Sequence, residues 1–396
     1  MSPTKLTLLL ASSLTVMSGA LVAPALPAIQ ADFADVDRVA LLTRMILTLP
    51  ALGIVVGAPL AGRYLNAHRR RPILLTALVT YAVVGTAGFL LPDLYLILAS
   101  RFLLGLAVAV ILPATVTLVG EYYEGDERAS FLGLQGAFMA LGGTVFVAVS
   151  GGLAGLGWRY VFLVYAFALV VGGLAYRYLP EPERQAKPGE RSEDVAPPSG
   201  PSREVWLTYA WVLLSMVAFY LVPVQSSFVM EAVGVEAEWL LGAGLILATV
   251  VSAAVSANFG RLSARFSAGQ LFAIAFLGMG VGFVVIGSYP AVATALVGSS
   301  IVGAATGIVM PNGNAHLIEI TAPERRAGVL GGMTTAIFLG QFLSPLAFQP
   351  VANAAGGLLA GHLWFGLATI GVAVVAWAVT RAGRSARPVP APDARA

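Results

Sequence analysis

The chain has 396 residues, of which 58% are hydrophobic and only 11% are charged, and its mean hydropathy is +0.84. A soluble globular protein carries about 25% charged residues, so this composition excludes a soluble fold and indicates a membrane protein. The formal net charge is only +3, and the absence of cysteine excludes disulfides and thiolate chemistry.

Apolar segments follow one another along the whole chain, and most are about as long as the 20 residues that span a bilayer. They must be helices, because the bilayer core offers no water to unpaired backbone groups. The first has only Lys5 before it and is too long for a signal-peptide core, so we expect it to remain as an anchor. The twelve predicted transmembrane helices are 6–28, 39–62, 72–91, 94–119, 129–153, 158–179, 206–230, 239–260, 270–288, 290–314, 327–350 and 361–380.

The basic residues of the connecting loops predict the orientation of these helices. With the N-terminus in the cytoplasm, only Arg38 and Arg159 of the loop cations lie outside, whereas the outer loops are mostly acidic. Basic residues gather on the cytoplasmic side of membrane proteins. We therefore expect a multi-pass protein of the cytoplasmic (inner) membrane with both termini in the cytoplasm.

Residues 181–205 differ in composition from the rest of the chain, because they mix several prolines with Glu, Arg, Ser and Gly. Such a segment cannot bury enough apolar surface to order itself. It is predicted to be a flexible cytoplasmic linker between an N-terminal six-helix bundle (1–180) and a C-terminal one (206–381), with a cytoplasmic tail at 382–396.

An internal repeat at an offset of 198 residues supports this division into halves. Arg101 breaks the repeat, because its counterpart is Ser299. Two parallel halves are a plan of membrane transporters. The matched pairs include Gly62 and Gly260, Gly105 and Gly303, Pro113 and Pro311, Glu121 and Glu319, and Arg128 and Arg326.

The loop after the second predicted helix reads Gly62-Arg-Tyr-Leu-Asn-Ala-His-Arg-Arg-Arg71. It resembles the loop signature Gly-x-Leu-Ala-Asp-Arg-x-Gly-Arg-Arg of the major facilitator transporters, with Asn66 in place of the Asp. Arg101 and Gly105 are similar to the Arg-x-x-x-Gly signature of the family's fourth helix, and the Gly-Trp-Arg-Tyr-Val-Phe run at 157–162 is also typical.

This resemblance implies an all-α membrane protein with 12 transmembrane helices in two pseudo-symmetric six-helix halves. It points to the drug and metabolite efflux branch. The antiporter signature of that branch is Gly-Pro-x-x-Gly-Gly, and residues 147–152 of this chain match its final Gly-Gly but not its Gly-Pro.

Two arginines lie well away from the ends of predicted helices, where a charge costs on the order of 3 kcal/mol or more and needs a partner or water. Arg101 matches a family position that supports the substrate and proton pathway; alternatively it snorkels to the outer interface. Arg44 could pair with Asp35 or Asp37 as a functional charge; alternatively it forms an outer-gate salt bridge or snorkels to the interface.

Uncharged side chains could line a substrate cavity or could bond across helices as packing contacts. These candidates are Gln135, Met139, Tyr220, Gln225, Asn312, Phe338, Gln341 and Phe342. Charged and loop residues at the predicted cytoplasmic ends could form a latch of an alternating-access cycle or simply be solvated. These latch candidates are Gly62, Arg63, Asn66, Arg70, Glu121, Arg128, Arg261, Glu319 and Arg326.

Several expected features of catalysts are missing from the sequence. The three histidines lie near predicted helix ends, no Asp or Glu falls mid-span, and lysine occurs only at 5 and 187. A Gly-Lys-Ser/Thr phosphate loop is therefore excluded, and no metal-ligand spacing occurs. We expect no enzyme, no cofactor, no metal and no nucleic-acid partner, and a monomer in the lipid bilayer.

The sequence thus predicts a secondary transporter that moves a small organic molecule by alternating access, by efflux and with protons as a possible coupling ion. The alternative is a facilitator or exchanger for an anionic solute that uses Arg44 and Arg101. A remote alternative is a membrane sensor that binds without transporting.

Overall fold

The computed structural model describes residues 1–181, 202–322 and 325–385, and within these ranges the chain forms helices without any β-strand. The helices of the first half are α1 (Pro3–Ala20), η1 (Ala23–Ala25), α2 (Leu26–Asp32), α3 (Val39–Ala67), α4 (Arg70–Thr86), η2 (Ala87–Phe89), α5 (Leu94–Tyr122), α6 (Gly125–Ala154), η3 (Trp158–Ala166) and α7 (Phe167–Tyr178). Those of the second half are α8 (Arg203–Phe219), α9 (Leu221–Ala232), η4 (Glu238–Leu240), α10 (Ala243–Ala257), α11 (Phe259–Ser263), α12 (Ala268–Ser288), α13 (Val292–Ile320), α14 (Arg326–Ala354) and α15 (Leu358–Ser385).

Each of the twelve predicted segments contains helix. Within the described residues, ten helical segments are long and apolar enough to cross a membrane. The other two predicted spans are shorter apolar helices, namely the described stretch Leu141–Ala154 of α6 and the 15 residues of α10. The chain is therefore a multi-pass α-helical membrane protein.

Local sequence signals explain where two of these helices begin. The Asp93 carboxylate follows Pro92 and accepts hydrogen bonds from the backbone nitrogens of Tyr95 and Leu96 at 2.8 and 3.0 Å, which caps α5. Ser267 and Gln270 form a reciprocal capping box at the start of α12. Such caps satisfy backbone N–H groups that the helix itself leaves unpaired.

The internal repeat is reproduced in the packing of helices. A Cβ atom on Gly105 of α5 would lie 2.1 Å from the carbonyl oxygen of Pro50 in α3, and one on Gly303 of α13 would lie 2.2 Å from that of Ala248 in α10. Pro50 and Ala248 are themselves 198 positions apart, as the two glycines are. Both halves therefore contain the same close helix crossing, which only glycine permits.

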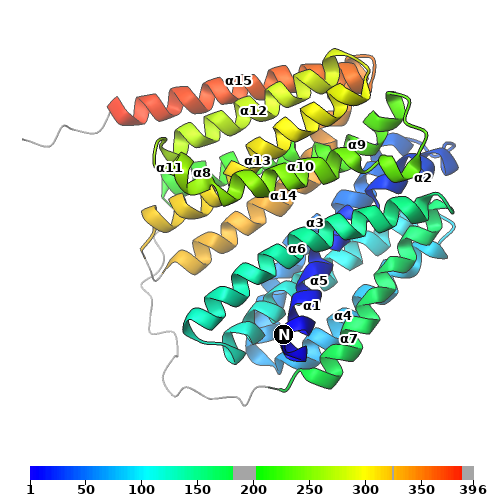
Figure 1. Ribbon diagram of the computed structural model, residues 1–396, viewed down its shortest axis with the longest axis vertical. Helices are drawn as coiled ribbons and strands as arrows, with labels where there is room; N and C mark the ends of the chain where they lie inside the picture. The colour runs from blue at the N-terminus through cyan, green and yellow to red at the C-terminus, as the bar shows by residue number, and fades with distance from the viewer. Residues whose placement is uncertain (182–201, 323–324, 386–396) are drawn as a thin grey trace, which may run out of the picture.

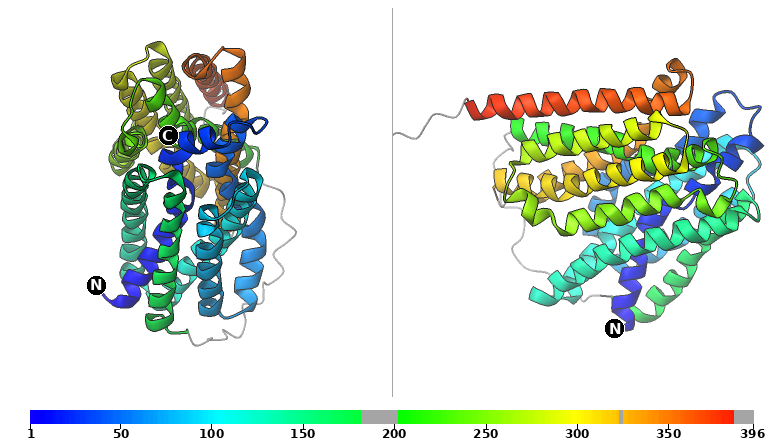
Figure 2. Two further views of the ribbon diagram at one scale, coloured as in Figure 1. Left: turned by 90° about the vertical axis from the view of Figure 1, so that its right-hand side faces the viewer. Right: turned by 45° about the horizontal axis from the view of Figure 1, so that its top comes forward.

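The two halves meet at one end of the molecule. Figures 1 and 2 show that their helices lie closest near α2 and α9 and spread apart toward the end that carries the N-terminus. We call the first of these the α2–α9 end. Residues 182–201 and 386–396 lie outside the described residues, so the flexible linker and the tail remain predictions.

Candidate functional site

Arg44 lies in α3 at the α2–α9 end, and only 6% of it is exposed. Its Nε donates to Oε1 of Gln225 at 2.8 Å and its Nη1 donates to Oε1 of Gln30 at 2.9 Å and to the carbonyl of Ala40. The guanidinium also lies over the ring of Phe228, 4.1 Å from its centroid. The suggested pairing with Asp35 or Asp37 is wrong, because the amide oxygens of Gln225 and Gln30 and an aromatic face surround the cation instead.

The partners of Arg44 join the two halves, since Gln225 and Phe228 belong to α9. A second bond does the same, because the Ser227 hydroxyl donates to the carbonyl of Ala23 at 2.7 Å. Tyr220 packs closely against Gly19 of α1, because a Cβ atom added to Gly19 would lie only 2.5 Å from the Tyr220 hydroxyl. Together these contacts close the boundary between the halves at the α2–α9 end.

Arg101 of α5 is fully buried at 0% exposure, which excludes snorkelling to the outer interface. Its Nη2 donates to the carbonyls of Val84 and Gly85 in α4 at 2.8 and 2.7 Å. Its guanidinium also lies over the rings of Phe162 and Tyr165, 4.9 and 5.0 Å from their centroids. The charge is thus enclosed within the first half, where it ties α4, α5 and η3 together.

The second half fills the corresponding place differently. Ser299 stands at the repeat position of Arg101, and Phe283 stands at that of Gly85. Ser299 and Phe283 line a cavity of about 10 Å³ together with Ser226 and His362. That volume is about what one water molecule needs. A phenylalanine ring and a small, mostly apolar cavity therefore replace a guanidinium and its aromatic neighbours.

Two of the predicted cavity residues instead bond between helices. The Gln135 amide of α6 donates to the Ser12 hydroxyl of α1 at 2.6 Å, and the Asn312 amide of α13 donates to the carbonyl of Ala268 in α12 at 2.9 Å. Both side chains are buried, and such bonds hold membrane helices together. Four other candidates are half-buried and keep their predicted role as a hypothesis: Met139, Phe338, Gln341 and Phe342.

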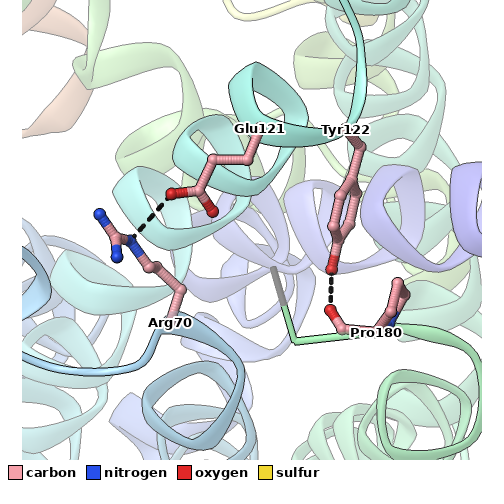
Figure 3. A network of polar contacts seen from close by, with 4 residues as sticks. All are labelled: Arg70, Glu121, Tyr122 and Pro180. Carbon is pink, nitrogen blue, oxygen red and sulfur yellow. Dashed lines mark hydrogen bonds and ion pairs between the residues drawn. The ribbon is translucent and has the colours of Figure 1, made fainter. Parts of the chain in front are cut away.

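At the opposite end of the molecule, Arg70 and Glu121 form one of the predicted latch contacts. Arg70 Nε lies 3.2 Å from Glu121 Oε1, as an ion pair without hydrogen-bond geometry (Figure 3). The Tyr122 hydroxyl beside it donates to the carbonyl of Pro180. Both contacts stay within the first half, so they brace α4, α5 and the end of α7 against one another.

The remaining latch candidates have different surroundings, and none of those with a described side chain forms an ion pair within the described part of the chain. Arg326 Nε donates to the carbonyls of Ile318 and Thr321, at the end of α13, rather than to the exposed carboxylate of Glu319. Arg261 donates to the Asn258 side chain at 2.7 Å. Gly62 lies in α3, where a Cβ would meet nothing within 4 Å. The side chains of Arg63, Asn66 and Arg128 lie outside the described residues.

His362 is a buried residue that the sequence reasoning passed over, because it lies near a helix end. It stands five positions into α15, it is 2% exposed, and its ring centroid is 4.7 Å from that of Phe348. Its Nδ1 carries a proton, because the atom 2.8 Å away is the carbonyl oxygen of Leu358, which can only accept. No periodic signal in the sequence predicts that His362 is buried, because its burial results from the packing of α12, α14 and α15.

The helices and the two repeated halves define a multi-pass membrane protein of the transporter type. The sequence profile of the Major Facilitator Superfamily matches residues 8–258, and the chain belongs to this family. The homologous proteins are transporters rather than enzymes, in agreement with the sequence prediction.

Curated relatives include several resistance proteins and transporters. The chain is 25% identical to the tetracycline resistance protein, class G, of Vibrio anguillarum over 90% of this chain and 92% of that protein. It is 30% identical to the niacin transporter NiaP of Acinetobacter baylyi, over 34% of this chain. It is 29% identical to the puromycin resistance protein pur8 of Streptomyces alboniger, over 46% of this chain. The last two matches span only 31% and 36% of those relatives.

Solved structures share the fold across nearly the whole chain. A bacterial homologue of the human lysosomal transporter Spinster, in an inward-facing and occupied conformation, matches with a TM-score of 0.77 at 16% identity, over 99% of this chain and 100% of that one. A D-xylose–proton symporter matches with a TM-score of 0.75 at 18% identity, over 95% and 97%.

Proposed function

We propose that this protein exports a small, partly apolar organic molecule across the bacterial cytoplasmic membrane by alternating access. The observation that carries the proposal is the closed boundary between the halves at the α2–α9 end, where Gln225 and Ser227 of one half bond to Arg44 and Ala23 of the other. The distribution of basic loop residues supports a location of the α2–α9 end on the outer side of the membrane. In this form the protein can take its substrate from the cytoplasm, which is a step that export requires.

Similarity to resistance proteins supports export rather than uptake. The match to the class G tetracycline resistance protein covers nearly all of both chains, and a further relative is the multidrug transporter protein MdtP of Bacillus subtilis. Proton antiport is the coupling that we propose. Because Arg does not release its proton in proteins, the titratable candidates among the described residues are His362 and the carboxylates near the α2–α9 end.

The test is transport by purified protein in liposomes of defined orientation. With tetracycline and puromycin as probes, we expect accumulation on the side of the α2–α9 end when a proton gradient is imposed, and loss of accumulation when an ionophore collapses it. Movement of both probes down their own gradients alone would refute the coupling. Failure to move any probe of this class, in protein that is folded and inserted, would refute the export proposal.

A facilitator or exchanger for anions is the second candidate, and one observation favours it. Arg44 is a buried cation whose hydrogen-bond partners are all uncharged. Counterflow of a radiolabelled organic anion, without dependence on a proton gradient, would select this alternative over export.

A further inference from the structure

Arg44 is a buried cation that takes part in neither of the ion pairs found in the described part of the chain. Those pairs are Arg70 with Glu121 and Arg159 with Asp32. A charge within a membrane helix costs on the order of 3 kcal/mol or more unless it is balanced or hydrated. A bound anion would therefore lower the free-energy cost of burying the charge of Arg44.

The guanidinium of Arg44 has donors to spare. Its hydrogen bonds to Gln225, Gln30 and Ala40 use Nε and Nη1, and within the described residues Nη2 has no hydrogen bond. A guanidinium carries five N–H groups in a planar fork, which suits two-pronged binding of a carboxylate. Arg101 also has a guanidinium nitrogen, Nη1, without a hydrogen bond in the described part of the chain, but it is fully buried beside aromatic rings and does not line the cavity next to Arg44.

A cavity of about 280 Å³ opens beside Arg44 at the α2–α9 end. Its polar wall is formed by Gln349 and Asn353, one turn apart on α14, and Gln349 Nε2 donates to Asn353 Oδ1 at 2.9 Å. The Oε1 atom of Gln349 is buried and has no hydrogen bond in the described part of the chain. Turned toward the cavity, this oxygen would accept a hydrogen bond from a hydroxyl or amino group of a ligand.

The rest of the cavity wall is apolar or backbone. The half-buried Leu358 supplies apolar surface, and α15 begins at this residue, directly after Gly356 and Gly357. The first peptide N–H groups of a helix are unpaired within it and favour negative charge. The volume lies just below the roughly 300–1,000 Å³ of sites for drug-sized ligands, so it suits a smaller molecule.

We infer that this cavity is a binding site for a small organic carboxylate that carries a hydroxyl or amino group. Arg44 balances the carboxylate, the Gln349 amide turns so that its oxygen accepts from the substituent, and Leu358 packs against the carbon skeleton. The site opens at the α2–α9 end and is separate from the midplane region between the halves in which the exported solute is expected. It exists in the closed form of this end, so its occupancy does not depend on transport.

The test compares two nearly isosteric probes by titration calorimetry on the full-length purified protein, at one pH and low ionic strength. We expect 4-hydroxybenzoate to bind saturably and the neutral 4-hydroxybenzamide to bind at least tenfold more weakly. Arg44→Gln should abolish the difference between the probes. The matched control is Arg159→Gln, which removes the half-exposed arginine that pairs with Asp32 and should leave both affinities unchanged.

A second variant keeps the test decisive if Arg44→Gln fails to fold. Gln349→Leu leaves the cation in place and should weaken 4-hydroxybenzoate severalfold more than benzoate, which lacks the hydroxyl. Equal binding of acid and amide, an unaffected Arg44→Gln variant, or no binding of 4-hydroxybenzoate would each overturn the site. Export of tetracycline is measured in parallel, because its failure with intact carboxylate binding refutes the proposed function alone.

Discussion

The Nε atom of Arg44 in α3 lies 2.8 Å from Oε1 of Gln225 in α9, and this hydrogen bond joins the two halves of the molecule at the α2–α9 end. Both residues are almost completely buried. A bond between a charged donor and a buried acceptor is worth more than one between neutral groups, so the pair is a candidate for the contact that holds this end closed.

Replacing Gln225 with Leu keeps the side-chain volume and removes the acceptor. A hydrogen bond to a charged group contributes about 1.5–3 kcal/mol, so the closed form should lose about tenfold or more in population relative to the open form. Because the chain has no cysteine, a single Leu47→Cys change gives a clean reporter. Leu47 is buried in α3, and its carbonyl lies near the Cβ position of Gly19, which the Tyr220 hydroxyl also approaches. The rate of maleimide labelling of the introduced thiol should rise in the Gln225→Leu background.

Gln135→Leu is the control for this measurement. Gln135 is also buried and hydrogen-bonded, but its partner Ser12 belongs to the same half. Its loss should lower thermal stability without changing the labelling of the introduced thiol at position 47. Equal labelling rates in the two backgrounds would show that the Arg44–Gln225 bond does not control opening.

Arg101→Ala tests whether this arginine is structural. The change removes two bonds to backbone carbonyls and two aromatic contacts, and it leaves a cavity, which together should destabilise the protein by about 3–5 kcal/mol. Thermal unfolding followed by intrinsic fluorescence should report a large decrease in Tm. Ser299→Ala, at the repeat position, should change Tm little. An unchanged Tm combined with lost transport would instead assign Arg101 to the substrate or proton pathway.

The two repeated glycine crossings should respond alike to substitution. Gly105→Ala and Gly303→Ala each place a methyl group within 2.1 and 2.2 Å of a carbonyl oxygen, so the helices must separate. Overpacking of this kind typically costs about 1–3 kcal/mol or more. Both variants should lower Tm by similar amounts, whereas Gly371→Ala, which meets nothing within 4 Å, should not. A large effect at one crossing alone would show that the halves are not mechanically equivalent.

The Arg70–Glu121 ion pair should matter little for stability. Its side chains are 23% and 28% exposed, and partly exposed pairs contribute about 0–1 kcal/mol. Arg70→Gln should therefore shift Tm only slightly, and the shift should shrink further at high salt. A Tm decrease as large as that of Arg101→Ala would indicate that the pair is part of a larger network at this end.

Hydrophobicity by itself determined the class of this protein. The twelve apolar segments, the glycine and proline landmarks repeated at 198 residues and the loop signature at 62–71 were sufficient to predict a helical membrane protein of two similar halves. These signals are local or periodic, and the bilayer leaves the helix as the only way for an apolar segment to satisfy its backbone.

Tertiary structure alone decided what each polar residue does. Arg44 and Arg101 are both single cations in apolar helices, and the sequence did not reveal that Arg44 lines a cavity while Arg101 is enclosed by aromatic rings and carbonyls. His362 and Gln349 carried no signal because their surroundings come from helices distant in sequence. A buried polar group takes its role from the partners that packing brings within hydrogen-bonding distance, and hydropathy does not encode those partners.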